Sequence, residues 1–461
     1  MLIRFAVENF MSFRDMTKFS MSAGKVTKHG DHVAIQRGKR ILKGSFLFGA
    51  NAAGKSNLVY ALDFASDIVK KGLNSVSCDK KYFRIDPKYK VKPGIFQFDL
   101  SSNGHFYSYG FAISYTSATV EEEWLYQIDN DTDICVFLRH KSEDSQTIVV
   151  DSDIPFSGER FRVYSEDITT PKMNQTLFLS DVVLRSPDNE PEYQAFRDVV
   201  DWFNKLIIIF PFSTYSGIMR LLDDDNRRTQ MSGLLEHFDT GIVSVSKQEG
   251  DIEKIFSGFS GKSFEAFKAK LIEDLKDEEE NLRGLVPYND SLVEVRYSDG
   301  SLYASRVSTN HGNENDLFEF SDESDGTRRL FDLIPIFQSA LSGRTIIVDE
   351  LDRSLHTKAT QEFIRYFYEV TEGIAAQLIV TTQDSNIMDL DFVRQDEIWF
   401  VERQADHSSK LYSLNQFKAR FDKKVERAYL LGRYGAIPVF KQFPAMDNDD
   451  ITEEETDDSN K

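Results

Sequence analysis

The 461-residue sequence predicts an α/β fold with a β-rich N-terminal lobe, a helical insertion and no long coiled coil. Three observations support this prediction. A glycine-rich loop at 49–56 stands between an apolar strand and a helix, and an apolar strand at 344–350 ends in two acids. Between 96 and 138, apolar and polar residues alternate with the period of two that is typical of half-buried strands.

The glycine-rich loop is a phosphate loop, because residues 49–56 carry the complete pattern G-x-x-x-x-G-K-S. In this pattern backbone N–H groups surround a β-phosphate, Lys55 bridges the β- and γ-phosphates, and Ser56 binds Mg²⁺. A glycine loop before a helix also arises by chance, but the apolar strand at 45–48 argues against that interpretation. The sequence therefore predicts ATP and Mg²⁺ as ligands. The candidate nucleotide-binding residues here are Gly49, Asn51, Ala53, Gly54, Lys55, Ser56 and Asn57.

The acid-ended strand supplies the second part of the predicted site. Its β-branched residues 345–348 are typical of a buried central strand. Because α/β sheets place ligands at the carboxyl ends of such strands, Asp349 is expected to bind Mg²⁺ and Glu350 to polarise the attacking water. An apolar run ending in Asp-Glu is common on its own, but the phosphate loop favours the functional interpretation.

A capped helix start at 320–330 is the third candidate element. Ser324 can cap the helix, and its hydroxyl, the N–H of Gly326 and the helix dipole can face a phosphate, with Thr327 beside them. In isolation an ordinary capped helix is the simpler interpretation. The position some twenty residues before the acidic strand favours a contact with nucleotide.

In this order the three segments resemble the ABC-type ATPases of the SMC and RecF kind, in which Ser-x-Gly before a helix is the signature motif. The opening segment 3–13, with Asn-Phe-Met-Ser at 9–12, is similar to the NF-x-S strand of that superfamily, and 351–356 resembles its D-loop. Segments 238–242, 323–327 and 432–438 are similar to the stand-alone AAA15 ATPases. Several of these are subunits of bacterial anti-phage systems, among which size and layout are most similar to the ATPase of PARIS.

The resemblance implies that ATP is sandwiched between two subunits. Lys55 and Ser56 of one subunit would face Ser324 and Gly326 of the other, so that ATP promotes or reshapes a homo-oligomer. The resemblance also implies that Asp352 communicates across this interface.

One position departs from the superfamily pattern. The strand at 377–382 resembles the one that ends in the switch histidine, but Gln383 stands in its place. Glutamine can hydrogen-bond a γ-phosphate or a water but cannot carry a proton, which favours slow, regulatory hydrolysis with Gln383 as a catalytic residue. A solvated strand end is the other interpretation. The Q-loop residue also stays open, between Gln97 and the pair at 180–181.

Composition and cysteine content indicate in which cellular compartment we expect the protein. No apolar run approaches the ~18 residues that a membrane span requires, and a first strand starting at Ile3 leaves no room for a signal peptide. Cys78 and Cys135 lack a CxxC spacing, so we expect reduced thiols, a cytoplasmic location and no membrane contact. Neither the eight histidines nor the two cysteines show the spacing of metal ligands.

Charge is distributed unevenly. The chain totals −20, yet residues 1–100 hold 18 Lys+Arg against 8 Asp+Glu, concentrated at 25–43 and 70–92. Such a stripe suits nucleic acid or an acidic protein, and a solvated face balanced by acidic lobes explains it equally well. The overall acidity argues against tight non-specific DNA binding. Direct DNA binding therefore stays open.

We expect four parts in the chain. They are a β-rich N-terminal ATPase lobe with the phosphate loop at 1–190, a mainly helical insertion at 191–290, a C-terminal α/β lobe with signature, acidic strand, D-loop and switch at 291–445, and a disordered acidic tail at 446–461. No heptad repeat persists between 190 and 290, which predicts the absence of a coiled-coil arm. About 60 residues follow the strand at 397–401, too few for the Toprim nuclease domain fused to OLD-type relatives.

The resemblance implies a sensor ATPase of a bacterial anti-phage, abortive-infection complex. Such a subunit holds a separate effector protein, a Toprim nuclease in the PARIS-like case, and releases it on detecting a phage-encoded trigger protein. The alternative is a RecF- or OLD-like ATPase in DNA repair or recombination, which DNA-stimulated hydrolysis would favour. A transporter ATPase subunit fits less well, because those usually keep the switch histidine.

Overall fold

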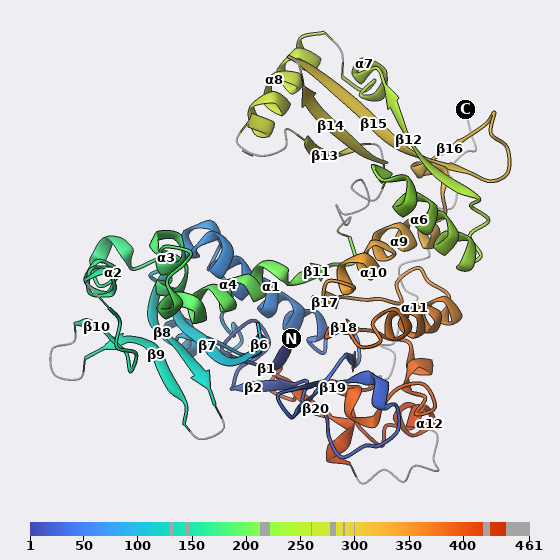
Figure 1. Cartoon of the computed structure of the whole chain (residues 1–461). Coiled ribbons are helices and arrows are strands. Elements are labelled where there is room, and N and C mark those ends of the chain that lie inside the picture. The colour runs from blue at the N-terminus through green and yellow to red at the C-terminus, as the bar shows by residue number, and fades with distance from the viewer. Residues whose placement is uncertain are drawn as a thin grey trace, which may run out of the picture.

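The computed structural model describes residues 1–129, 132–142, 147–157, 159–212, 222–259, 261–276, 283–288, 291–298, 300–417 and 425–438. These residues form three main sheets with helices around them (Figure 1). The expected acidic tail at 446–461 lies outside the described residues.

The N-terminal lobe is a seven-stranded antiparallel sheet in the order β10-β9-β8-β7-β6-β1-β2. The strands predicted between 96 and 138 are confirmed, since the alternating residues of β6 point in turn to a buried and to a half-buried side. The strands are β1 (Leu2–Glu8), β2 (Thr17–Ser20), β6 (Gly94–Ser102), β7 (His105–Ser114), β8 (Thr119–Ile128), β9 (Ile134–Lys141) and β10 (Ile148–Asp151). A separate hairpin joins β3 (Val33–Gln36) to β4 (Lys39–Leu42).

The second sheet carries the phosphate loop and has the order β11-β17-β18-β5-β19-β20. Its first five strands pair in parallel, and only β20 is antiparallel. The strands are β5 (Gly44–Phe48), β11 (Ile207–Ile209), β17 (Thr345–Val348), β18 (Gln377–Thr381), β19 (Ile398–Arg403) and β20 (Ser409–Ser413). Strand β5, from the first fifty residues, thus lies between two strands from the last hundred residues. Every residue of β5, β17 and β18 is buried, as expected for central parallel strands.

Each face of this parallel sheet builds its own hydrophobic core. Along β17, Ile347 points into the core shared with the antiparallel sheet, whereas Ile346 and Val348 point into the opposite core. The first core is completed by α1 (Lys55–Lys71), α3 (Phe178–Arg185) and α4 (Gln194–Lys205), with α2 (Arg160–Ile168) at its edge. The second core is completed by α6 (Asp225–His237), α9 (Asp325–Leu333), α10 (Pro335–Ala340), α11 (Thr357–Val370) and α12 (Val425–Leu430).

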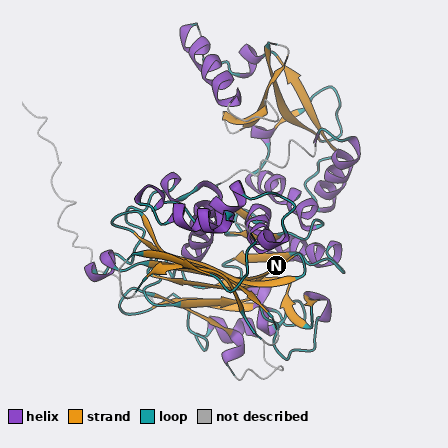
Figure 2. Cartoon of the chain, turned by 60° about the vertical axis from the view of Figure 1, so that its left-hand side comes forward, coloured by secondary structure: helices purple, strands orange, loops and turns teal. Residues whose placement is uncertain are grey.

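A third, antiparallel sheet projects from this body in both views (Figures 1 and 2). It has the order β12-β15-β14-β13, with β16 paired to β15, and a small core of its own that includes Phe256 and Val293. Its elements are β12 (Ser244–Gly250), α7 (Ile252–Ile255), α8 (Lys262–Lys276), β13 (Arg283–Tyr288), β14 (Ser291–Ser298), β15 (Ser301–Asn310) and β16 (Phe318–Glu319).

The third sheet differs from the mainly helical insertion expected at 191–290. The helix expected at 264–282 is present as α8, but it packs on a sheet whose strands lie on both sides of residue 290. Strand β12 has the polar sequence Ser-Val-Ser-Lys-Gln-Glu-Gly, which gives no strand signal by itself. It pairs with β15, some fifty residues further on.

The predicted fold class, an α/β fold with a β-rich N-terminal lobe and no long coiled coil, is confirmed for the described residues. The longest helix there is the 17-residue α1.

Within the described residues, no helix combines the length and the apolar character needed to span a membrane.

Candidate nucleotide-binding site

The phosphate loop leaves β5 and enters α1 in a conformation that its two glycines make possible. A Cβ on Gly49 would lie 2.3 Å from the carbonyl oxygen of Val401 on β19. Gly54 has a φ of +108°, and a Cβ there would lie 2.2 Å from the hydroxyl oxygen of Ser409. Only glycine combines this close approach with that backbone angle. The loop is therefore fitted tightly against the far end of the chain.

Lys55, the first residue of α1, is almost fully buried at the base of this loop. Its Nζ donates to the carbonyl oxygens of Gly49 at 2.7 Å and Ala50 at 3.4 Å. Burial lowers the pKa of Lys55, and the nearby carboxylates of Glu350 and Asp349 act in the opposite direction. Its ammonium group thus lies inside the curve of the loop, within reach of both the loop backbone and the acidic strand.

The acidic strand meets the phosphate loop through oxygen atoms. Ser56 Oγ donates to Asp349 Oδ1 at 3.2 Å, and Thr381 Oγ1 donates to the same oxygen at 2.5 Å. The Glu350 N–H donates in turn to Thr381 Oγ1 at 2.8 Å. A hydroxyl and a carboxylate that converge in this way are hard oxygen donors of the type that Mg²⁺ prefers. Ser56 and Asp349 therefore fit the predicted metal site.

The residues after the strand adopt an unusual backbone. Glu350 has a φ of 51°, a left-handed value that is uncommon for a side chain of this size. Asp352 Oδ2 accepts a hydrogen bond of 3.1 Å from the backbone N–H of Gln383, and Asp352 Oδ1 is buried without a partner in the described residues. The Gln383 side chain is exposed. The structure thus brings Asp352 and Gln383 together but leaves both interpretations of the glutamine side chain open.

The serine of the opening NF-x-S segment fixes the loop from the other side. Ser12 Oγ accepts a hydrogen bond of 2.7 Å from Asn57 Nδ2. The Ser409 hydroxyl of β20 lies 2.7 Å from Ser12 Oγ and 2.6 Å from the carbonyl oxygen of Ala53. Asn57 and Ala53 therefore position the loop, and Ser12 links them to the sheet edge.

The signature segment begins α9 as expected. Ser324 caps this helix by accepting from the Thr327 N–H at 3.1 Å, and the two hydroxyl oxygens lie 2.9 Å apart. A Cβ on Gly326 would lie 2.8 Å from the carbonyl oxygen of Ser354, so the helix start packs on the predicted D-loop. Among the described residues, no hydrogen bond or ion pair joins Ser324, Gly326 or Thr327 to the phosphate loop.

Sequence reasoning missed two residues at this site, Thr381 and Arg329. Arg329 is 4% exposed, and its Nη2 donates to the carbonyl oxygens of Asp349 at 3.2 Å and Glu350 at 3.3 Å. Burial lowers its pKa, and its Nε and Nη1 have no partner in the described residues. The available signals were an arginine beside an apolar helical stripe and a threonine ending a buried strand.

The two Q-loop candidates lie in other surroundings. Gln97 Nε2 donates to Asp99 Oδ1 at 3.2 Å and to Ser108 Oγ at 3.0 Å within the antiparallel sheet. Ser180 Oγ donates to the carbonyl oxygen of Val69 at 2.8 Å. In the described part of the chain neither bonds to Ser56 or Asp349.

A cavity of 610 Å³ opens beside the phosphate loop. Its walls are the loop residues Ala50, Asn51 and Ala53, the segment 401–405 with His407, and residues 436–438. The last segment is held in place because the Ala436 N–H donates to Glu402 Oε1 at 3.2 Å and Tyr429 donates to the Ala436 carbonyl oxygen at 3.1 Å. The volume lies within the range of ~300–1,000 Å³ that is typical of small-molecule sites.

A glycine-rich loop between a buried parallel strand and a helix, with serine and aspartate oxygens beside it, defines a phosphate-loop nucleotide-binding domain. The chain belongs to an AAA-domain family: residues 45–389 match the family model described as "AAA domain, putative AbiEii toxin, Type IV TA system".

Solved structures of SMC head domains are similar to this chain, with low scores. An SMC head from Thermotoga maritima shares 12% identity over 89% of this chain and 98% of that chain, at a TM-score of 0.38. An SMC head bound to the C-winged helix domain of ScpA shares 15% identity over 90% of this chain and 99% of that chain, at a TM-score of 0.36. A third structure is an SMC head with an extended coiled coil, bound to the C-terminal domain of ScpA derived from Pyrococcus furiosus. It shares 14% identity over 94% of this chain and 98% of that chain, at a TM-score of 0.35. No curated protein sequence matched the chain.

We predict that Thr381→Val destabilises the protein by roughly 1–3 kcal/mol, because it leaves a part-buried Glu350 N–H and a buried Asp349 oxygen without this hydroxyl. Urea denaturation of both proteins measures the effect. Thr360→Val is the matched control, since Thr360 is also fully buried but makes only a 3.5 Å bond within its own helix. Equal destabilisation by the two substitutions would contradict a special role for Thr381.

Proposed function

We propose that the chain is an ATP-binding and slowly ATP-hydrolysing sensor subunit of a bacterial anti-phage complex, most like the ATPase of PARIS systems. The observation that carries the nucleotide part is the convergence of Lys55, Ser56 and Asp349 at the base of the phosphate loop. The family description, which names a toxin–antitoxin system, supports the defence context.

Each residue of the site then has a defined task. Lys55 exchanges its bonds with the loop carbonyls for the β- and γ-phosphates of ATP, and the 610 Å³ cavity receives the base and sugar. Ser56 and Asp349 hold Mg²⁺, which neutralises phosphate charge. Glu350, set at an angle to its strand by its left-handed backbone, orients the attacking water.

The ATP sandwich completes this site with a second copy of the chain. The signature residues Ser324, Gly326 and Thr327 form no hydrogen bond or ion pair with the described part of their own phosphate loop, which supports a role toward the γ-phosphate held by the partner subunit. Arg329 connects the signature helix to the backbone of Asp349 and Glu350. Through this contact, nucleotide bound at the interface would change the position of the acidic residues.

The effector in this proposal is a separate protein, a Toprim nuclease, and the trigger is a phage-encoded protein. The net charge of −20 suits an ATPase that acts on proteins more than on DNA. The alternative, a RecF- or OLD-like repair ATPase, depends on the basic residues near the N-terminus. Several of these are engaged within the chain: Lys43 is buried and donates to the Thr371 carbonyl oxygen, and Lys28 pairs with Asp391.

We predict that Lys55→Ala abolishes ATP binding, because it removes the charged phosphate contact. Glu350→Gln should keep ATP binding while slowing hydrolysis by roughly 100-fold or more, the effect of losing a general base. Binding of a fluorescent ATP analogue and release of phosphate measure the two effects. Glu122→Gln, on an exposed position of β8, is the control. Rapid hydrolysis by Glu350→Gln would overturn the assignment of the base.

We predict that ATP drives Glu350→Gln protein into a larger assembly, and that adding Ser324→Asp prevents it. Aspartate keeps the helix cap but places a negative charge against the partner's phosphate. Ser324→Asn is the matched control, because asparagine caps equally well without charge. Light scattering after size-exclusion chromatography gives the mass. Assembly by the aspartate variant as complete as by the asparagine variant would contradict the sandwich.

Affinity purification from the native operon tests the defence role. We expect Glu350→Gln protein, purified with ATP, to retain a stoichiometric second protein with nuclease motifs, which mass spectrometry identifies. Lys55→Ala protein is the control for dependence on nucleotide. A chain that elutes alone or with DNA, and whose hydrolysis DNA stimulates, would favour the repair ATPase instead.

A further inference from the structure

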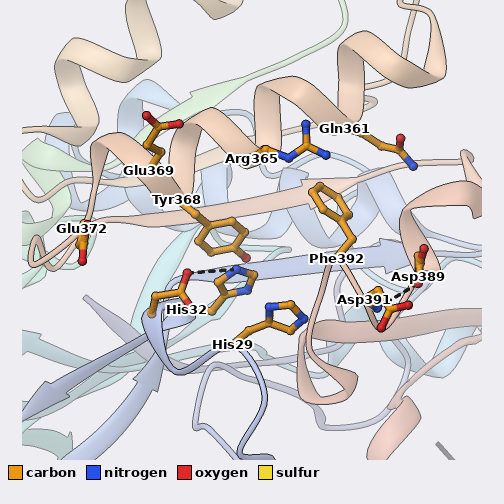
Figure 3. A pocket seen from close by; sticks show the side chains of 11 residues that line it. His29, His32, Gln361, Arg365, Tyr368, Glu369, Glu372, Asp389, Asp391 and Phe392 are labelled. Carbon is orange, nitrogen blue, oxygen red and sulfur yellow. Dashed lines mark hydrogen bonds and ion pairs between the residues drawn. The ribbon is translucent and has the colours of Figure 1, made fainter.

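A second cavity, of 640 Å³, lies away from the residues of the nucleotide site. It is enclosed by the loop at 29–32, one side of α11 and the segment 389–392 (Figure 3). Five carboxylates line it, from Asp31, Glu369, Glu372, Asp389 and Asp391, against the guanidinium of Arg365, and Asp391 also pairs with Lys28. This excess of negative charge favours a cation.

Three side chains from one short loop come together at the cavity wall. One ligand atom each from His29, Asp31 and His32 can be chosen so that all lie within 4.8 Å of one another. His29 has a left-handed φ of 53°, and residues Gly30–His32 form a 3₁₀ turn, η1. This backbone brings the imidazole rings to a centroid distance of 5.0 Å with 24° between their planes. Spacing along the sequence gave no sign of this cluster, because the turn geometry creates it.

Hydrogen bonds to the outside of the cluster fix both histidine tautomers. His32 Nδ1 lies 3.1 and 3.2 Å from the two oxygens of the buried Glu397, and His29 Nε2 lies 3.2 Å from the carbonyl oxygen of Leu390. Because a carboxylate and a carbonyl only accept, those nitrogens carry the protons. In the neutral rings the lone pairs therefore sit on His32 Nε2 and His29 Nδ1. Imidazoles held by an outer carboxylate or carbonyl are typical of metal ligands.

The ring of His32 is also held by stacking. Tyr368 of α11 stacks on it with a centroid distance of 3.4 Å and 3° between the planes, and its hydroxyl donates to Glu397 Oε1 at 2.9 Å. Asp31, by contrast, is 61% exposed, with Oδ2 at 3.8 Å from His32 Nε2. The cluster thus combines a fixed imidazole with a carboxylate that is free to adjust.

We propose that His29, Asp31 and His32 bind a divalent transition-metal ion of the Zn²⁺ type, with the remaining coordination position facing the cavity. Two imidazoles and one carboxylate are an established donor set for such ions. Tetrahedral Zn²⁺ with bonds of about 2.0–2.2 Å holds its ligand atoms roughly 3.3 Å apart. Asp31 is exposed and His29 is half-buried, so these two side chains supply the small movement toward the buried His32 that this requires.

The ion would join distant parts of the ATPase core. Its outer partners, Leu390 and Glu397, follow the switch position Gln383 along the chain, and Tyr368 lies on α11, which follows the D-loop. Metal binding would therefore hold the N-terminal loop on the two segments that lead away from Asp352 and Gln383.

Competition with a chromogenic chelator measures Zn²⁺ binding in excess Mg²⁺, which occupies the nucleotide site. We expect one Zn²⁺ per chain, and at least ~100-fold weaker binding by His29→Asn and by Asp31→Asn, since loss of a ligand costs more than the 10–100-fold of an outer partner. Asparagine tolerates the left-handed backbone of His29. His407→Asn is the matched control, because His407 has a similar φ of 65° and lies outside the cluster.

Cobalt gives a second readout. Co²⁺ in place of Zn²⁺ should produce the visible absorption of a site with nitrogen and oxygen ligands, lost in His29→Asn and kept in His407→Asn. Zn²⁺ binding that is absent, or equal in the wild type and His29→Asn, would overturn the proposal. The cluster would then only hold the loop at 29–32 on Glu397 and Leu390 through hydrogen bonds.

Discussion

The parallel pairing of β5 with β18 and β19 is the constraint on which the nucleotide site depends. It joins residues 44–48 to strands that begin more than 300 residues later, and the phosphate loop is completed only when they meet. Gly49 packs on Val401, and the Ala53 carbonyl oxygen accepts a hydrogen bond from the Ser409 hydroxyl. The loop motif is local in sequence, but its conformation is imposed by the opposite end of the chain. Bringing together segments so far apart in the chain costs conformational entropy, which the packing of the completed core offsets.

Several energetically unfavourable features occur together at the carboxyl end of β17. One Asp349 oxygen receives two hydroxyl hydrogen bonds, and Glu350 takes a left-handed backbone. The buried Arg329 guanidinium donates to both carbonyl oxygens, while its Nε and Nη1 have no partner among the described residues. Strain and unsatisfied polar groups of this kind persist where function requires them. Arg329 links α9 directly to this strand end, because its Nη2 donates to the carbonyl oxygens of Asp349 and Glu350.

Sequence reasoning succeeded where the signal was local. The phosphate loop, the acid-ended strand and the strands of the N-terminal lobe each show their period or motif within a dozen residues, and the structure places them as α/β elements. It failed where roles arise from contacts between distant segments. Thr381 and Arg329 look like ordinary polar residues until β18 and α9 pack beside β17, and the polar β12 becomes a strand only through its pairing with β15. The cluster at 29–32 depends on a left-handed turn that no pattern indicates.

The third sheet leaves and rejoins the body of the protein at one place. The start of β12 lies beside the end of β15, with Ser244 paired to Asn310 and the Val243 N–H donating to the Asn310 carbonyl oxygen at 2.8 Å. Phe256 and Val293 belong to a separate core. A segment whose two ends touch can be exchanged, enlarged or shortened without moving the strands that carry the phosphate loop. The third sheet is thus built as a replaceable module, whose size and content are independent of the parallel sheet.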